Sequence, residues 1–479
     1  MLNVREIIDL MAQPKAADEK IITEALAFAE EAHRGQKRFS GEPYIIHPFE
    51  VAKNLAEMGA DTDSIVAGLL HDTIEDCPTQ KSDLEKKFGP TVAFLVDGVT
   101  KLGKLKYQGV ERHAESLRKF FVASAEDIRV IMIRLADRLH NVRTLQHVPK
   151  EKQRRIAIET LDIYAPLASR LGMWRIKGAL EDASFPYAYP KEYAKVVALR
   201  KTKGKESVKK LEKVYRDLSR ELAKFKLKNF QIDYRIKYLY SLYEKLQRKD
   251  MNIEQIYDLS ALRVIVENVS DCYQTLGIIH NLYRPVPNRL KDYIANPKPN
   301  GYQSIHTAVF TGDGSMVEIQ IRTSAMHQEA EYGVASHIAY DESGKPKIGG
   351  KMTKNIEWIQ ELIEWQKNVA HHDEFLQTLK TDFFQSRIFV FTPKGEVVEL
   401  PLGATALDFA YNIHSDIGDK AVGARINGKF SPLSHSLKNR DLVEIETKKS
   451  GRPNVKWLEF VKTSAARTHI KRYLQGERK

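Results

Sequence analysis

The spacing of apolar residues changes along this chain near residue 230, and the change rules out a single fold class. Upstream, segments such as AADEKIITEALAFAEEAH and TDSIVAGLLHDTIED repeat apolar residues at steps of three and four, which predicts helices. Downstream, ALRVIV, YQSIHTAVF and MVEIQIRT are short runs of β-branched and aromatic residues, which predict strands between helices such as DCYQTLGIIHNLY. We therefore expect an all-α domain followed by an α/β or α+β domain.

Proline, glycine and charge patterns divide the chain further. Pro186 and Pro190, in FPYAYPKEY, mark the end of the first helical region. RIFVFTPKGEVVELP predicts a hairpin with a KG turn, and DLVEIET predicts the last strand of the same compact unit. The predicted units are an all-α domain (1–190), an α+β domain (191–345) that begins with a charged helical connector (191–228), a helical linker (346–386), a β-rich unit (387–448) and the start of another helical region (449–479).

Composition narrows the cellular setting. No run of about 18 apolar residues occurs, so we expect no membrane helix. The N-terminus lacks the basic-then-apolar pattern of a secretory signal. Cys77 and Cys272 lie far apart, which fits a reducing cytosol and excludes a thiolate metal cluster. We therefore expect a cytoplasmic protein, and its formal charge of +12 favours polyanionic partners, either nucleotides or RNA.

The segment HDTIED carries the first candidate chemistry. If one helix runs through it, His71 lies beside Glu75 and Asp72 lies beside Asp76, because residues four apart share a helix face. Imidazole together with carboxylate suits a transition ion such as Mn²⁺ better than Mg²⁺. A metal held in this way acidifies a bound water and neutralises a phosphate oxygen, and Glu75 and Asp76 could then manage protons.

A second helix supplies the remaining ligand. Asp137, Asn141 and Thr144 recur at helical spacing in LADRLHNVRTL, so one face presents a carboxylate and two hydrogen-bonding groups. A lone HD dipeptide on a helix is more often a surface or capping pair than a metal ligand. Here two helices deliver several chelating side chains, which favours a metal site. The predicted ligands are His47, His71, Asp72 and Asp137.

These segments also carry a family resemblance. RFSGEPYIIHP, LLHDTIED, VDGVTKLGK and DIRVIMIRLADRLHNVRTL resemble the hydrolase half of RelA/SpoT enzymes, which are HD phosphohydrolases. The resemblance implies removal of the 3′-pyrophosphate from (p)ppGpp, with Mn²⁺ on the four ligands and with Glu75 and Asp76 activating water. Phe39 stands where many relatives carry a basic residue. The nucleotide contacts that the resemblance implies are Arg38, Ser40, Asn141 and Thr144.

The downstream domain carries a different chemistry. Strand alternation in MVEIQIRT places Glu318, Gln320 and Arg322 on the face opposite Val317, Ile319 and Ile321. Asp258 leads into a neighbouring strand, so Asp258 and Glu318 could meet across the sheet and hold Mg²⁺ with a nucleoside triphosphate.

The loop RLKDYIANPKPNGYQSIH adds cations near Tyr302, whose ring can stack on guanine. Transfer of a pyrophosphoryl group needs such cations on the phosphate oxygens. Outward-facing charges and basic loops are common on protein surfaces. These residues alone therefore support a nucleotide-binding site and an ordinary solvated surface equally.

The same region resembles the alarmone synthetase domain of the RelA/SpoT family, through IYDLSALRVIV, RLKDYIANPKPNGYQSIHTAV and VEIQIRTSAMHQEAEYGVASH. This implies transfer of the β,γ-pyrophosphate of ATP to the 3′-hydroxyl of GDP or GTP. Asp258 would hold Mg²⁺, Glu318 would share it or act as base, and Tyr302 would stack on guanine. Arg235 and Arg263 would clamp adenine. The remaining implied nucleotide contacts are Lys237, Lys245, Arg289, Lys291, Lys298, Asn300, Gln303 and His306.

Two features of this domain bear on which activities it carries. Residues 289–292 read RLKD, which matches the RxKD signature of bifunctional relatives. In YRIKYLYSLYEKL, however, Tyr234 stands where relatives usually have Gly, and Tyr238 where they usually have His. The alternative is therefore a hydrolase-only enzyme whose degenerate synthetase domain senses nucleotide.

The β-rich unit resembles a TGS domain, a small β-grasp module, over RIFVFTPKGEVVELPLGATALDFAYNIHSDIGDKAVGARINGK. The resemblance implies sensing of uncharged tRNA on the ribosome, with His414 meeting the tRNA 3′ end. From the residues alone, a histidine near a helix end is more often a cap. A pure tRNA- or ribosome-binding regulator is a further alternative, but it leaves the two chelating constellations unexplained. Relatives continue into further helical, zinc-finger-like and ACT regions, so we expect this sequence to be a piece of a longer protein.

Overall fold

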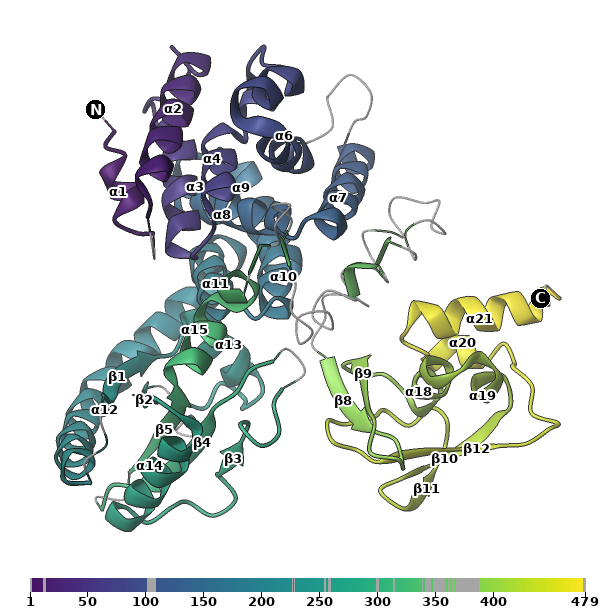
Figure 1. Cartoon of the computed structure of the whole chain (residues 1–479). Coiled ribbons are helices and arrows are strands. Elements are labelled where there is room, and N and C mark those ends of the chain that lie inside the picture. Colours follow the sequence, from purple (N-terminus) through teal and green to yellow (C-terminus); the bar gives the residue numbers. More distant parts are fainter. Residues whose placement is uncertain are drawn as a thin grey trace. The chain divides into compact units, whose positions relative to one another are not determined.

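The structure is a computed structural model, and it divides into two compact units, Met1–Trp365 and Gln366–Lys479 (Figure 1). It describes residues 2–11, 14–100, 109–225, 227, 229–253, 256, 260–298, 301–312, 315–337, 339–340, 346–347, 358–360, 362–363, 366, 375, 379 and 387–476.

The first part of the first unit is helical, as predicted. Helix α8 lies at its centre, because nearly every residue from Arg129 to Leu139 is buried, and it packs against α3, α4, α6, α7 and α11. The helices are α1 (Arg5–Ile8), α2 (Ala16–Ala32), α3 (Ile46–Glu57), α4 (Thr62–Leu70), α5 (Thr73–Asp76), α6 (Lys81–Val99), α7 (Gly109–Glu126), α8 (Arg129–Arg143), α9 (Lys150–Glu159), α10 (Ala165–Arg170) and α11 (Trp174–Ala188), with a π-helical turn at Thr160–Tyr164.

Close packing of α3 and α4 determines where the polar residues at the start of α3 and the end of α4 lie. Gly68 lies on α4, and a Cβ there would stand 2.5 Å from Leu55 Cδ1 of α3. A larger residue at 68 would therefore displace the Leu55 side chain. The two helices approach closely here, and the start of α3 lies near the end of α4.

The helix predicted through SIVAGLLHDTIED is in fact two helices, because α4 ends at Leu70 and α5 begins at Thr73. His71 Nδ1 bonds the Gly68 carbonyl at 2.9 Å, and Thr73 Oγ1 bonds the Leu70 carbonyl at 2.7 Å. These side chains compete for carbonyls that a continuous helix would use for its next turn. The single helix expected here is therefore wrong, whereas the pairing of His71 with Glu75 stays a prediction.

The second part of the first unit is an α+β domain, again as predicted. Its five-stranded sheet has the order β1-β2-β5-β4-β3, in which only the β2–β5 pair is parallel. Its elements are α12 (Pro190–Lys224), β1 (Gln231–Ile236), α13 (Leu239–Gln247), β2 (Ser260–Val266), α14 (Val269–Leu282), β3 (Lys291–Asp292), β4 (Ile305–Phe310), β5 (Met316–Thr323) and α15 (Ser324–Tyr332), followed by the short strands β6 (Ala339–Tyr340) and β7 (Pro346–Lys347).

One face of this sheet is apolar and the other is polar. Val317, Ile319 and Ile321 of β5 lie in a core that α12 and α14 complete, which confirms the predicted alternation. Tyr234 of β1 is on this covered side, where its ring stacks on Tyr215 of α12 with centroids 5.4 Å apart. Arg235 therefore lies on the polar face of the sheet, and Tyr234 does not share that face.

The second unit has a β-grasp arrangement, as predicted. Its hairpin turns at Gly395, where φ is 83°, and a three-stranded sheet β11-β10-β12 packs with the hairpin around Phe409 of α18. Its elements are β8 (Arg387–Phe391), β9 (Val397–Pro401), α18 (Ala406–Ile413), α19 (Ser415–Asp419), β10 (Ala421–Ile426), β11 (Lys429–Ser431), β12 (Val443–Thr447), α20 (Trp457–Phe460) and α21 (Ser464–Leu474). None of the helices that the structure describes combines the length and the hydropathy of a membrane span.

Candidate functional sites

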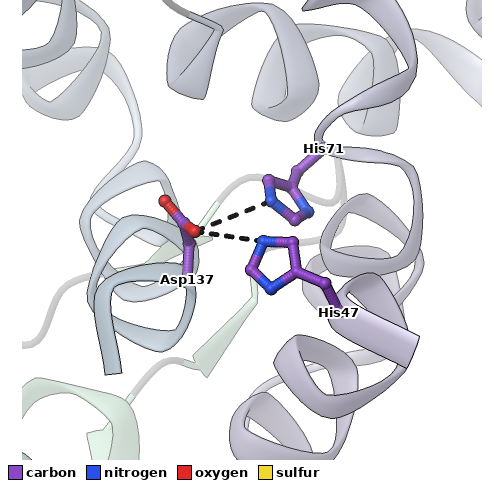
Figure 2. Close-up of side chains that lie close together, drawn as sticks. All are labelled: His47, His71 and Asp137. Carbon is purple, nitrogen blue, oxygen red and sulfur yellow. Dashed lines mark ion pairs between the residues drawn. The ribbon is translucent and has the colours of Figure 1, made fainter. Parts of the chain in front are cut away.

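His47, His71 and Asp137 converge between α3, α4 and α8 (Figure 2), and Asp72 lies next to them. His47 Nε2 lies 3.5 Å from Asp72 Oδ2 and 3.3 Å from Asp137 Oδ1. His71 Nε2 lies 3.2 Å and 3.9 Å from the same two oxygens. The ligand atoms of His47, His71 and Asp137 all lie within 4.8 Å of one another, and all three residues are buried. The four residues predicted as metal ligands are therefore adjacent.

Hydrogen bonds at Nδ1 set the tautomer of both histidines. A carbonyl only accepts, so the His71 Nδ1 at 2.9 Å from the Gly68 carbonyl carries the proton. Arg38 only donates, so His140 Nδ1 accepts from Arg38 Nη1 at 2.9 Å. His47 Nδ1 lies 2.7 Å from that accepting nitrogen and must carry a proton itself. In the neutral form of each ring, Nε2 is thus the unprotonated nitrogen and offers its lone pair to a metal.

This electron-rich cluster favours a bound cation. Burial works against a charged His71, yet the neighbouring Asp72 carboxylate raises the pKa of His71 to about 9. His71 Nε2 is also buried without a hydrogen-bond partner among the described residues. The two imidazoles and the Asp137 carboxylate, with Asp72 beside them, therefore fit a divalent metal, whose charge would replace the Nε2 proton of His71.

The aspartates are held by Asn141 and by two residues that the sequence did not single out, Tyr44 and Arg134. Arg134 Nη1 donates to Asp137 Oδ2 at 3.0 Å, and Asn141 donates to Asp137 Oδ1. The Tyr44 hydroxyl lies 2.8 Å from Asp72 Oδ2 and 3.0 Å from Asp76 Oδ2. Asp72 and Asp76 are therefore neighbours, as predicted.

The residues predicted to contact nucleotide in the hydrolase half differ in how closely they adjoin this cluster. Arg38 donates to Asn141 Oδ1 at 2.8 Å, so these two residues form one polar group beside His140. The Thr144 hydroxyl bonds the His140 carbonyl at 3.0 Å, and the Ser40 hydroxyl bonds Glu42 at 2.9 Å.

Asp137 and Asn141 also line a cavity of about 340 Å³. Arginine and histidine side chains contribute much of its polar lining, which suits an anionic ligand. These residues are Arg134, Arg138, Arg155 and His113, from α7, α8 and α9.

The polar face of the sheet carries the second cluster of candidate functional side chains. His306 Nδ1 lies 3.3 Å from Glu318 Oε1, and the Tyr302 hydroxyl lies 2.8 Å from His306 Nε2. Burial lowers the pKa of His306, so the ring is neutral near pH 7. A neutral ring satisfies both contacts when Tyr302 donates to Nε2 and Nδ1–H donates to Glu318. Glu318, His306 and Tyr302 thus form one hydrogen-bonded chain.

Cations surround this chain. The Lys298 ammonium lies 4.7 Å from the Tyr302 ring centroid, and burial together with Lys291 and Arg235 lowers its pKa to about 8. Burial and Arg322 lower the pKa of Arg263 to about 10, although Glu331 pairs with both arginines.

Other predicted synthetase residues are less defined. Asp258 and Asn300 lie outside the described residues. Ala261, three residues after Asp258, pairs with Glu318, so β2 does run beside β5. The Gln303 amide bonds the Ile294 carbonyl at 3.2 Å, and Arg289 is exposed. Lys237, between β1 and α13, and Lys245, in the last turn of α13, are partly buried.

His414 has the capping role expected from the residues alone. Its Nδ1 accepts the Asp416 N–H at 3.2 Å at the start of α19, and its ring is exposed. The two readings are compatible, because a capping ring that faces solvent still offers its other nitrogen.

Sequence reasoning missed Tyr44, Arg134, His140 and Trp174. Tyr44 and His140 each lie three residues from a predicted ligand, which is a helical spacing, and both lay inside motifs already identified. Trp174 lies in the helical half but contacts Tyr302 of the sheet domain, with centroids 6.3 Å apart. No local pattern in the sequence signals such a distant contact.

Family models match three successive parts of the chain. An HD domain matches residues 25–174. The region found in RelA / SpoT proteins matches residues 234–345. A TGS domain matches residues 388–447.

Curated relatives align with nearly the whole chain. It is 48% identical over 469 residues to a guanosine-3′,5′-bis(diphosphate) 3′-pyrophosphohydrolase of Aquifex aeolicus, covering 97% of this chain and 66% of that protein. It is 47% identical over 466 residues to a GTP pyrophosphokinase of Myxococcus xanthus, covering 96% and 61%. It is 45% identical over 458 residues to the bifunctional (p)ppGpp synthase/hydrolase SpoT of Escherichia coli, covering 95% and 65%. The chain spans less than two thirds of the length of each.

Proposed function

The chain belongs to the RelA/SpoT family, and on that basis we propose that it is a bifunctional alarmone enzyme of the stringent response. One site would hydrolyse (p)ppGpp to GDP or GTP and pyrophosphate. The other would transfer pyrophosphate from ATP to the 3′-hydroxyl of GDP or GTP. Relatives with names for each activity support the proposal. The observation that best supports the proposal is the presence of two separate polar clusters, one of His and Asp side chains and one around Glu318.

In the hydrolase half, His47, His71, Asp72 and Asp137 would hold Mn²⁺, because mixed imidazole and carboxylate ligands suit that ion. When bound, the metal would lower the pKa of a water and neutralise a phosphate oxygen. The hydrogen bonds at Nδ1 keep both histidines in the tautomer that a metal ligand requires.

Proton transfer in this half would fall to the acidic residues of α5. Asp76, which Tyr44 holds beside Asp72, and Glu75 would accept the proton of the attacking water. The water oxygen would bond to the phosphorus while the 3′-oxygen leaves and receives a proton. Arg38, Ser40, Asn141 and Thr144 would bind the nucleoside, and the adjoining basic cavity offers charge to its phosphates.

In the synthetase half, Glu318 and Asp258 would hold Mg²⁺ with ATP. Glu318 would also accept the proton of the 3′-hydroxyl, and His306 would orient it through the 3.3 Å contact. Tyr302 would stack on guanine. The cations that would bind phosphates and adenine are Arg235, Lys237, Lys245, Arg263, Arg289, Lys291 and Lys298, with Asn300 and Gln303 as polar contacts.

The alternative of a hydrolase-only enzyme rests on Tyr234 and Tyr238. Tyr234 lies on the covered side of the sheet, stacked on Tyr215, so its departure from the family pattern leaves the polar face intact. This supports the bifunctional reading. Incubation with ATP, GDP and Mg²⁺, and separately with ppGpp and Mn²⁺, tests it. Absence of ppGpp formation under all conditions would favour the alternative.

Regulation through the second unit is also a proposal. The TGS match and the exposed ring of His414 support binding of uncharged tRNA in a ribosomal context. We further propose the cytoplasm as its location and retain the domain limits 1–190, 191–345, 346–386, 387–448 and 449–479. The family matches fall within these limits.

A further inference from the structure

An aromatic cage encloses the Lys298 ammonium at the candidate acceptor site. Its nitrogen lies 4.8 Å from the Tyr293 ring centroid, 4.7 Å from that of Tyr302 and 5.9 Å from that of Trp174. Tyr293 and Trp174 also meet Tyr302 edge to face, with centroids 6.2 Å and 6.3 Å apart. These distances are typical of cation–π and aromatic pairs. We call Trp174, Tyr293, Lys298 and Tyr302 the lysine cage.

The lysine cage uses groups that an acceptor nucleotide would need. A base stacks on a tyrosine face, and Lys298 lies over a face of Tyr302. A phosphate needs an accessible ammonium, yet Lys298 is partly buried among the rings. The cage and a bound guanine nucleotide therefore compete for the same two side chains.

One wall of the cage comes from the hydrolase half. Trp174 is the first residue of α11, whereas the other three members lie between β3 and β4. The indole Nε1 of Trp174 is buried without a hydrogen-bond partner among the described residues. The indole is therefore held by ring contacts, and it is free to separate from the cage without breaking a polar bond.

Helix α11 is fixed to the synthetase half at successive turns of the same face. Four residues after Trp174, a Cβ on Gly178 would lie 2.1 Å from the Tyr238 ring, so that ring fills the space above the glycine. Four residues further on, the carboxylate of Asp182 accepts the Leu239 N–H at 3.1 Å and the Tyr240 N–H at 3.0 Å. The same helix packs against α8, which carries Asp137.

We propose that Trp174 gates the acceptor site of the synthetase: it stabilises the lysine cage, and the guanine nucleotide binds only when the cage opens. This inference rests on the proposed synthetase activity. Opening frees the Tyr302 ring for the base and Lys298 for a phosphate oxygen. Trp174 is thus a positioning residue that lies in one catalytic half and controls access to the other.

The test compares three variants of the full chain, Trp174→Phe, Trp174→Leu and Trp174→Ala. Leu keeps apolar bulk without a ring, whereas Phe keeps a ring. We expect the KM for GDP and its Kd to fall about threefold to tenfold in the Leu and Ala variants, the size of one cation–π contact, and to stay near the wild-type value in the Phe variant. The kcat of synthesis is expected to change less than KM, and ppGpp hydrolysis reports that each variant is folded.

The same substitution made in a Lys298 variant shows whether Trp174 acts through the Lys298 ammonium. In Lys298→Met, the change Trp174→Leu should have no further effect on GDP affinity. Equal KM values in wild type and the Leu variant, or a raised KM, would overturn the gate while leaving the synthetase proposal intact. Absence of GDP binding and of synthesis in the wild-type protein would overturn both.

Discussion

The Nδ1 atoms of His47 and His140 lie 2.7 Å apart, and only one of them carries a proton. Arg38 donates to His140 Nδ1, so the proton is on His47 and its Nε2 is left as a ligand. His140 therefore orients a candidate metal ligand without belonging to the ligand set. Burial, with His47 and Arg38 nearby, lowers the pKa of His140 to about 3, which keeps its ring neutral and able to accept.

This relationship predicts the effect of substituting His140. His140→Leu removes the acceptor and should weaken Mn²⁺ binding on the order of 10- to 100-fold, the usual effect of losing a group that orients a metal ligand. His140→Asn places an amide oxygen near the former Nδ1 position and should restore part of that affinity. Calorimetric titration of the metal-stripped protein with Mn²⁺ measures both. Equal affinities for Leu and Asn would show that the hydrogen bond does not matter.

Separate sites predict that the two activities can be removed one at a time. Asp72→Ala should abolish ppGpp breakdown and leave synthesis measurable, because it removes a candidate Mn²⁺ ligand far in sequence from the sheet. Glu318→Ala should do the reverse. Initial rates of both reactions in both variants decide the matter. Loss of both activities in either folded variant contradicts the separate-site assignment.

Nucleotide bound at one site should also suppress the activity of the other site, because synthesis and hydrolysis running together would only consume ATP. Saturating Glu318→Ala with ATP and GDP should slow its ppGpp hydrolysis, and a coupling of about 1–3 kcal/mol gives a 5- to 150-fold bias. The charged connector, roughly residues 190–228, is the route suggested by the sequence, and α11 adds a direct contact. Hydrolysis that is unchanged at saturation argues against antagonism.

Two substitutions at Tyr302 separate stacking from hydrogen bonding. Tyr302→Ala should weaken GDP binding by about 1–3 kcal/mol, as for loss of one base–aromatic stack. Tyr302→Phe keeps the ring but loses the 2.8 Å contact with His306, so it should retain GDP affinity and lower the kcat of synthesis. Equilibrium GDP binding and steady-state kinetics test the pair. Unchanged affinity and synthesis in the Ala variant would remove Tyr302 from the site.

His414 offers a matched pair for the tRNA proposal. His414→Ala, in a version that extends beyond residue 479, should reduce stimulation of synthesis by uncharged tRNA on ribosomes. His414→Asn keeps an acceptor for the Asp416 N–H and so preserves the cap of α19. If Asn loses stimulation like Ala while both remain folded, the ring itself binds tRNA. Full stimulation in the Ala variant contradicts the assignment.

Much of the fold and of the His–Asp cluster could be predicted because it depends on local periodicity. Helical spacing identified the α8 face with Asp137, and strand alternation placed Glu318 opposite Ile319. The break between α4 and α5 could not be predicted, because side-chain competition of His71 and Thr73 for backbone carbonyls leaves the apolar pattern unchanged.

Contacts between distant segments were beyond the reach of pattern reasoning. Trp174 and Tyr302 are brought together by packing between two domains, and neither residue's neighbours indicate the other. Tyr234 is a second example: its departure from the family pattern suggested a degenerate synthetase domain, yet its ring stacks on Tyr215 of α12, away from the polar face.

The fit of the Tyr238 ring over Gly178 restricts how these two positions can diverge. Any side chain at 178 would enter the space of that ring, and removing the ring would leave a void between α11 and the β1–α13 segment. A substitution at either position alone is therefore unfavourable, whereas a larger residue at 178 together with a smaller one at 238 restores the packing. The contact thus couples the two halves of the chain, because a substitution on either side of it constrains the residue that the other side can accept.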